Sequence, residues 1–468
     1  MKTRWGLAAA LLAAAAGQAQ TVSLKQLLDS AEQQNVDRRI THEQRLKAAA
    51  DFRSAWTSLL PSFTGQASWT HNQYAAEFKQ YDTSNSPFLI GTPACIDGLR
   101  SDPPNPAGCG GTLNNGQIIK TQVAEMPPAY TIPIQLGDQF DGLLRFDLPL
   151  IDTTRWTRTM AASSADDAAA LREQLTSDLV KRQVVGAYFG YAAALSVRES
   201  AKKSVAVAEA QLNLMEIRFK AGAVTELEQL RARAEVQRNR QVVADTENLV
   251  ATTRRSLRTV TGLDPGDVVP MPTDDLTPEK GFEELEQNIE GLPAVKAADK
   301  DAEGANRLGW SSRLLLLPSI SANFMERFSN ATGFTGKTAN WSVGVAAVWR
   351  LDVPTFMGLE GARATEATAV LAAERARLQA RDQVHSDWQR LKAAMIKVEA
   401  AAAQSTAASR AAQVARDRYA VGAATQVDVI QAERDLFGAE VSQIQARTEL
   451  ASARASLHLS AGLPLGIE

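Results

Sequence analysis

The chain has 468 residues, of which 45% are hydrophobic and 22% charged, and its formal net charge is −3. This composition excludes a disordered chain, and the near balance of charge excludes the basic surface of a nucleic-acid-binding protein. The four histidines fall singly and there is no phosphate loop or nucleophile elbow, so neither an enzyme nor a metal or cofactor site is expected.

The amino terminus has the features of a secretory signal. Two basic residues precede an apolar run, and small residues end it at Ala19, so residues 1–19 are expected to be removed. Gln20 follows the cut, which predicts no lipid-modified cysteine. No later run of about 18 apolar residues could form a membrane helix, so any membrane crossing must use strands.

Strands are expected after a short helix over residues 36–58. In residues 62–69, apolar or small side chains alternate with polar ones, which is the period of a half-buried strand. Residues 140–148 alternate in the same way, with one lapse at Leu143. The intervening insertion, residues 73–139, contains Cys95 and Cys109, which form either a disulfide that closes a small loop or two free thiols.

A very long helix is expected over residues 155–221. The segment lacks proline and is rich in Ala, Leu, Glu, Gln and Arg, and at 1.5 Å per residue it would be about 100 Å long. Gly222 can end this helix in the left-handed conformation, and Thr225 can cap the next one. That second helix ends near Gly262 and is about half as long, so the two form a helical hairpin.

The plan of the first half occurs twice. The segment RFKAGAVT at 218–225 recurs as RYAVGAAT at 418–425, an offset of 200, and LLPS at 59–62 recurs at 316–319, an offset of 257. The expected organisation is a first repeat over 20–263, a connecting belt over 264–293 rich in Pro, Gly, Asp and Glu, and a second repeat over 294–468. The second repeat supplies helices over 294–316 and 361–421, another hairpin, and alternating strands at 320–324 and 341–349.

The strands point to an assembly. About four strands of roughly ten residues suit a membrane crossing, but they cannot close a barrel, and unpaired backbone groups cost several kcal/mol each in lipid. Three chains would give twelve strands, with Trp69, Trp341 and Trp349 in the aromatic girdles. The alternative is a soluble four-stranded sheet packed on helices, which the secretory signal and the 100 Å helices disfavour.

The duplicated plan and the two hairpins resemble the TolC-like outer membrane efflux protein family, the outer membrane factors of tripartite efflux and type I secretion systems. Residues 418–430 are the most similar segment, and the resemblance covers the mature chain apart from the insertion. It implies a mainly α-helical, internally duplicated chain with membrane strands. Its homotrimer would have a twelve-stranded β-barrel continued by a twelve-helix periplasmic α-barrel. The insertion would then face outside, to plug or gate the mouth or to meet an extracellular partner.

The resemblance also implies a location, partners and functional residues. The chain would lie in outer-membrane lipid with a large periplasmic extension, as the exit duct for an RND or ABC pump of the inner membrane. A periplasmic adaptor would contact the hairpin turns, unless these residues serve only to make tight turns: Ala221, Gly222, Ala223, Val421, Gly422 and Ala423. Glu228 and Asp428 would form an acidic pore constriction, with uncharged Gln431 beside it where some relatives carry a second acid. An acid in a first helical turn also simply favours the helix dipole.

A rival interpretation is a trimeric coiled-coil surface adhesin with a barrel anchor. Such a protein would carry its strands in one terminal segment, whereas this chain divides them between two halves. The transported substrate, the particular pump and adaptor, and the role of the insertion are not specified by the sequence.

Overall fold

The computed structural model describes residues 22–81, 129–273, 275–349 and 351–465. The chain divides into two compact units. The first unit is helical and comprises residues 1–55, 157–313 and 353–468. The second unit carries the strands and comprises residues 56–156 and 314–352. The signal segment and both cysteines lie outside the described residues.

The helices of the first repeat begin and end close to the expected positions. They are α1 (Leu24–Gln34), α2 (Val36–Thr57), the 68-residue α4 (Thr153–Lys220) and α5 (Glu226–Thr261). The separate helix α1 was not foreseen. The side chain of Asn35 accepts hydrogen bonds from the backbone N–H groups of Asp37 and Arg38, at 2.9 and 3.3 Å, so it caps α2 and separates it from α1.

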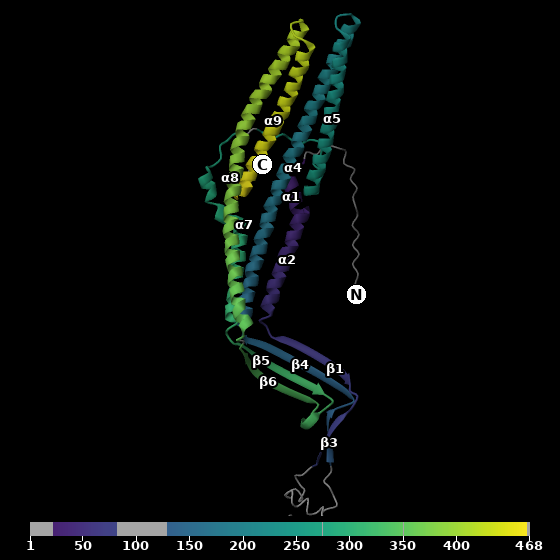
Figure 1. Ribbon diagram of the computed structural model, residues 1–468. Coiled ribbons are helices and arrows are strands. Elements are labelled where there is room, and N and C mark those ends of the chain that lie inside the picture. The colour runs from purple at the N-terminus through teal and green to yellow at the C-terminus, as the bar shows by residue number, and fades with distance from the viewer. Residues whose placement is uncertain (1–21, 82–128, 274, 350, 466–468) are drawn as a thin grey trace, which may run out of the picture. The chain divides into compact units, whose positions relative to one another are not determined.

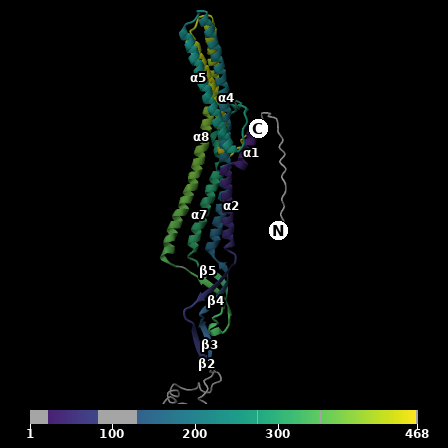
Figure 2. The ribbon, with the colours of Figure 1, turned by 90° about the vertical axis from the view of Figure 1, so that its right-hand side faces the viewer.

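The second repeat follows the same plan. It contains α7 (Pro293–Leu314), the 68-residue α8 (Val353–Ala420) and α9 (Gln426–Ser460). Before α7, the connecting belt contains the short helix α6 (Phe282–Glu286) and the 3-10 turn η3 (Ile289–Gly291). Figure 2 shows α7 lying beside α8, and an ion pair of 2.6 Å between Arg377 and Asp299 joins the two helices.

The hydrophobic core of the helical unit has one main cluster for each repeat. Tyr191 and Leu257 are fully buried in the first cluster, and Val384 and Leu457 in the second. Each cluster lies where the long helix, the shorter hairpin helix and segments of the belt meet. Among the residues that the structure describes, no helix is both long and apolar enough to span a membrane.

Four antiparallel strands form the main sheet of the second unit, in the order β1-β4-β5-β6. They are β1 (Ser62–His71), β4 (Asp138–Ile151), β5 (Ser319–Ser329) and β6 (Ala339–Val348). Each repeat therefore contributes two paired strands. The two pairs are joined because β4 of the first repeat pairs with β5 of the second (Figure 1).

Register gives the sheet one apolar face. Phe63 pairs with Phe146, which pairs with Phe324, which pairs with Val343, so these side chains share one face of the sheet. Phe63 and Val343 are 68% and 72% exposed. The next set of paired residues, in which Thr64 pairs with Arg145, lies on the other, more polar face. Exposed apolar side chains on one face are what lipid would cover.

A second, two-stranded ladder lies within the region expected to be a loop. Its strands are β2 (Ala76–Tyr81) and β3 (Ala129–Gln135), from the two ends of the insertion. The expectation of four strands was therefore incomplete. β2 is only six residues long and β3 contains Pro133, so neither gives a clear strand signal on its own.

Candidate docking and pore site

The two hairpin turns have the same local structure. Gly222 and Gly422 adopt φ angles of 72° and 74°, the left-handed conformation that a side chain disfavours. The backbone N–H of Ala223 donates to the carbonyl of Arg218, and that of Ala423 to the carbonyl of Arg418, both at 2.8 Å. All six turn residues at 221–223 and 421–423 are exposed. The turns therefore present backbone and small side chains at the free ends of the hairpins.

Both predicted pore acids act as parts of helix caps. The Glu228 carboxylate accepts the backbone N–H of Thr225 at 2.8 Å, and the Thr225 hydroxyl accepts the backbone N–H of Glu228 at 3.4 Å. Asp428 and Thr425 exchange the same two bonds at 2.8 and 3.3 Å. These are capping boxes, which satisfy amide groups that the first helical turn leaves free.

The cap also affects the charge of Asp428. Hydrogen bonds from the hydroxyl and the backbone N–H of Thr425 hold the pKa of this carboxyl below its ordinary value of 3.8. Asp428 is therefore an anion at neutral pH. Capping leaves the second carboxylate oxygen available, so a structural role and a pore role are compatible in this geometry.

Gln431 lies one turn beyond Asp428 on α9. Its side-chain amide donates to Asp435 at 2.9 Å, so it lies next to an acid that was not among the predicted pore residues. In the first repeat the residue equivalent to Asp435 is Glu235, which instead pairs with Arg434 of the other hairpin. Both repeats therefore carry an acid at this position, but the two acids have different partners.

Contacts between the two hairpins lie close to their turns. The Tyr419 hydroxyl lies 3.2 Å from the Met215 sulfur, within a small apolar cluster. The side-chain amide of Gln426, which is 2% exposed, donates to the carbonyl of Glu228 at 2.8 Å. The contacts of these three side chains could not be predicted from the sequence, because nothing in their local pattern marks a contact with a segment about 200 residues away.

A buried ion pair links the long helices farther from the turns. Asp387 of α8 is fully buried, and its carboxylate lies 3.6 Å from Arg182 of α4 and 3.6 Å from Arg390 of α8. The side-chain amide of Gln383 donates to it at 3.0 Å. This ion pair occurs in only one arrangement. The residues at an offset of 200 from Arg182 and Asp387 are Asp382 and Ala187, which cannot form the same pair.

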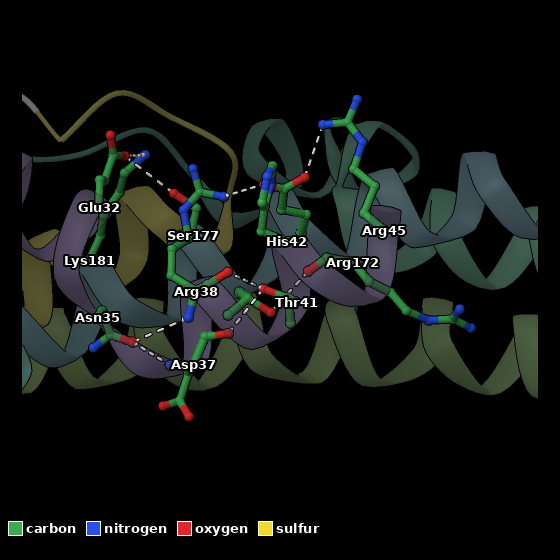
Figure 3. Close-up of polar contacts among 12 residues, drawn as sticks. Glu32, Asn35, Asp37, Arg38, Thr41, His42, Arg45, Arg172, Ser177 and Lys181 are labelled. Carbon is green, nitrogen blue, oxygen red and sulfur yellow. Dashed lines mark hydrogen bonds and ion pairs between the residues drawn. The ribbon is translucent and has the colours of Figure 1, made fainter. Parts of the chain in front are cut away.

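Three basic side chains of α2 contact one carboxylate of α4. Figure 3 labels these basic side chains, Arg38, His42 and Arg45. Arg38 and His42 contact one oxygen of Glu173 at 3.0 and 3.1 Å, and Arg45 contacts the other at 2.9 Å. Burial by itself would raise the pKa of Glu173. Hydrogen bonds from Arg45 and His42 and the charges of both arginines outweigh burial, so the pKa lies below its ordinary value of 4.5.

No metal site accompanies these charges in the described part of the chain. No group of three or more His, Cys, Asp or Glu side chains there could hold a metal ion. The disulfide candidates Cys95 and Cys109 lie outside the described residues, so their pairing stays a prediction.

Comparison with known sequences gives two matches. A family described as "Outer membrane efflux protein" matches residues 137–263 and 285–463, more than half of the chain. Protein CyaE of Bordetella pertussis is 25% identical over 313 residues, which are 64% of this chain and 66% of CyaE. The match therefore spans slightly less than two thirds of that relative.

Comparison with solved structures finds the same fold. The outer membrane channel CmeC of Campylobacter jejuni has a TM-score of 0.72 at 17% identity, covering 95% of this chain and 86% of CmeC. The outer membrane protein VceC of Vibrio cholerae has a TM-score of 0.70 at 16% identity, covering 94% of this chain and 96% of VceC. At these identities the likeness concerns the fold alone.

Proposed function

Because the chain belongs to the outer membrane efflux protein family, we propose that three copies of it form a single exit duct across the outer membrane. The chain is an outer-membrane channel with a large helical periplasmic part. In the described sheet, β1 and β6 are edge strands with no neighbour on one side. Open edges are not tolerated in lipid, so neighbouring copies would pair them into a barrel of twelve strands. Family membership leaves the adhesin alternative without support.

The duct would receive its substrate from an inner-membrane pump of RND or ABC type through a periplasmic adaptor. The observation that carries this proposal is the pair of exposed turns, which share one geometry on hairpins that contact each other. Three copies would present six such turns in one ring. A protein with six similar sites could then dock on them.

Val421 tests the docking role, because its side chain is 79% exposed and takes no part in the cap. A Val421→Asp substitution should greatly reduce co-purification of the adaptor from cells, while the thermal midpoint of the purified channel stays unchanged. Asp245→Asn, an exposed change in the middle of α5, is the matched control. Undiminished co-purification by Val421→Asp would remove this turn from the docking surface.

The acidic constriction is a second part of the proposal. Three copies would bring up to six carboxylates from Glu228 and Asp428 to the narrow end, where their field favours cations over anions. Gln431 would leave the ring with less charge than two acids per hairpin would supply.

The capping boxes determine which variants test the ring. Alanine at either position would also remove a helix cap, whereas Glu228→Gln and Asp428→Asn keep a side-chain oxygen that accepts the threonine N–H. For purified full-length protein in planar lipid bilayers, the double variant should lose most of its cation selectivity, measured from the reversal potential in a salt gradient. Unchanged selectivity and conductance would contradict the acidic ring without contradicting the channel.

A further inference from the structure

The apolar face of the main sheet differs between its two ends. At one end Phe63, Phe146 and Phe324 form a continuous row of large side chains. Four residues farther along β1 and β4, the paired residues are Ala67 and Gly142, which leave an open hollow of about 530 Å³. For comparison, an apolar cavity of about 150 Å³ is enough to bind benzene. This space, called the outer hollow, can therefore take a sizeable apolar group.

Three aromatic side chains form the walls of the outer hollow. Trp69 and Phe140 pair with each other on one side of it, and Phe328 lies on the other side. Their exposed fractions are 60%, 57% and 40%. A Cβ added at Gly142 would meet the Cβ of Phe328 at 3.5 Å, so Phe328 lies close against the floor. The groups that face the space are thus mostly apolar.

Hydrogen bonds hold the margin of the outer hollow in place. The side-chain oxygen of Asn330 accepts the backbone N–H of Phe140 at 2.8 Å, and its amide donates to the carbonyl of Asp138 at 2.9 Å. The backbone N–H of Ser329 donates to the carbonyl of Thr338 at 2.8 Å. The outer hollow is therefore built into the sheet and is not a gap between loose side chains.

The position of the outer hollow along the strands indicates which leaflet it meets. β1 follows α2 at Ser62, and β4 continues into α4 after Ile151. Trp69 and Phe140 each lie two residues from the opposite ends of these strands. Because the helical part of the channel is periplasmic, those opposite ends lie toward the outer leaflet of the membrane. Lipid of that leaflet is what covers an apolar sheet face there.

A positive charge lies beside the outer hollow. Lys337 is exposed and directly precedes Thr338, which lines the hollow. The carbonyl of Lys337 accepts a hydrogen bond from the side-chain amide of Asn340 at 3.4 Å, which holds this turn. Within the described residues Lys337 has no ion-pair partner. Lysine near a membrane surface attracts anionic lipid headgroups.

We propose that the outer hollow binds an acyl chain of a phosphorylated glycolipid of the outer leaflet, with a phosphate of the same lipid on Lys337. The inference rests on the barrel proposed above, in which the apolar face of the sheet meets lipid. The acyl chain gains from burial of apolar area against the three aromatic walls, and the phosphate gains from the charge beside them. A neutral lipid would satisfy only the first of these two features.

Binding of purified lipid A, the phosphorylated and acylated disaccharide of the outer leaflet, tests this site. Delipidated full-length protein in detergent should bind added lipid A, as followed by native mass spectrometry. Ala67→Leu fills the floor of the hollow and should weaken binding about tenfold, because acyl methylene groups lose their place. Lys337→Gln should weaken it about fivefold through the lost charge, and Lys337→Arg should restore it.

Two matched variants control for general changes of the surface. Val345→Leu enlarges an exposed side chain elsewhere on the same face, and Lys79→Gln removes an exposed lysine of β2. Both should bind lipid A as the native protein does.

The possible failures are distinguishable. Equal binding of lipid A by Ala67→Leu and Val345→Leu, in channels that still conduct in planar bilayers, would overturn the lipid site and leave the duct intact. Binding of phosphatidylglycerol as tight as that of lipid A would overturn the assignment to the outer-leaflet glycolipid. Native protein that does not conduct at all would overturn the proposed duct itself.

Discussion

The two longest helices, α4 and α8, show how one sequence plan meets two environments. Both have 68 residues and end in the same turn, but α4 buries Ala161, Ser164 and Ala168 near its start. The equivalent residues of α8 are exposed, and its first buried residue is Ala373. Duplication therefore fixed the length and the ends of these helices, whereas the neighbours of each helix determine which faces are covered.

The largest effect is expected where α4 and α8 meet through a buried charge. Arg182→Met should lower the free energy of unfolding by about 3 kcal/mol, because Asp387 would keep one charged neighbour in a fully buried place. Chemical denaturation in detergent, followed by circular dichroism, would measure this change. Asp382→Asn, at the equivalent exposed position of α8, should change stability by less than about 0.5 kcal/mol.

A compensating variant separates the charge from the packing. If the cost of Arg182→Met comes from the unpaired carboxylate, Arg182→Met/Asp387→Leu should regain most of the lost stability. Equal losses in the single and the double variant would mean that the ion pair is not what couples the helices here.

An intermediate effect is expected at Glu173, which has only a buried alanine as its equivalent in α8. Glu173→Gln should cost about 2 kcal/mol, because two arginines and a histidine would lose their shared anion. The shift of the thermal midpoint would measure it, with Glu374→Gln on the exposed surface of α8 as control. A loss no larger than that of the control would exclude a stabilising role for this cluster.

The same carboxyl predicts a pH dependence. Its pKa is lowered in the folded state, so its contribution to stability is fully present above the ordinary value of 4.5 and is lost as pH falls through the lower folded value. Thermal midpoints measured from pH 6 down to pH 3, values chosen to bracket that transition, should fall more steeply for the native protein than for Glu173→Gln. Parallel curves would show that other groups dominate acid unfolding.

The smallest effects are expected at the turns, where the two repeats are alike. Thr225→Ala and Thr425→Ala should each cost about 1 kcal/mol, because each removes a hydroxyl that caps a helix. Hydrogen exchange should rise in the first turn of α5 or α9, to a similar extent in both. A clearly larger rise in one hairpin would show that contacts between the hairpins, and not the local cap, set the stability of that turn.

The sequence was most informative where structure depends on neighbours along the chain. Gly222 and Thr225 are local signals, so the turn and the helix boundaries could be predicted within a few residues. The acids were identified through family resemblance, and their hydrogen bonds in the caps became visible only in the structure. Partners such as Arg182 and Asp387 could not be predicted, because packing between distant helices brings them together. The strands β2 and β3 were missed because β2 is only six residues long and β3 contains Pro133.

The equal lengths of α4 and α8 constrain how the chain can change. An insertion of one helical turn in one of them alone would displace its hairpin end by about 5.4 Å relative to the other. Gln426 would then no longer reach the carbonyl of Glu228, and Tyr419 would miss Met215. Lengthening or shortening therefore has to happen in both halves of the gene together, by the same number of residues, if the two ends are to stay level.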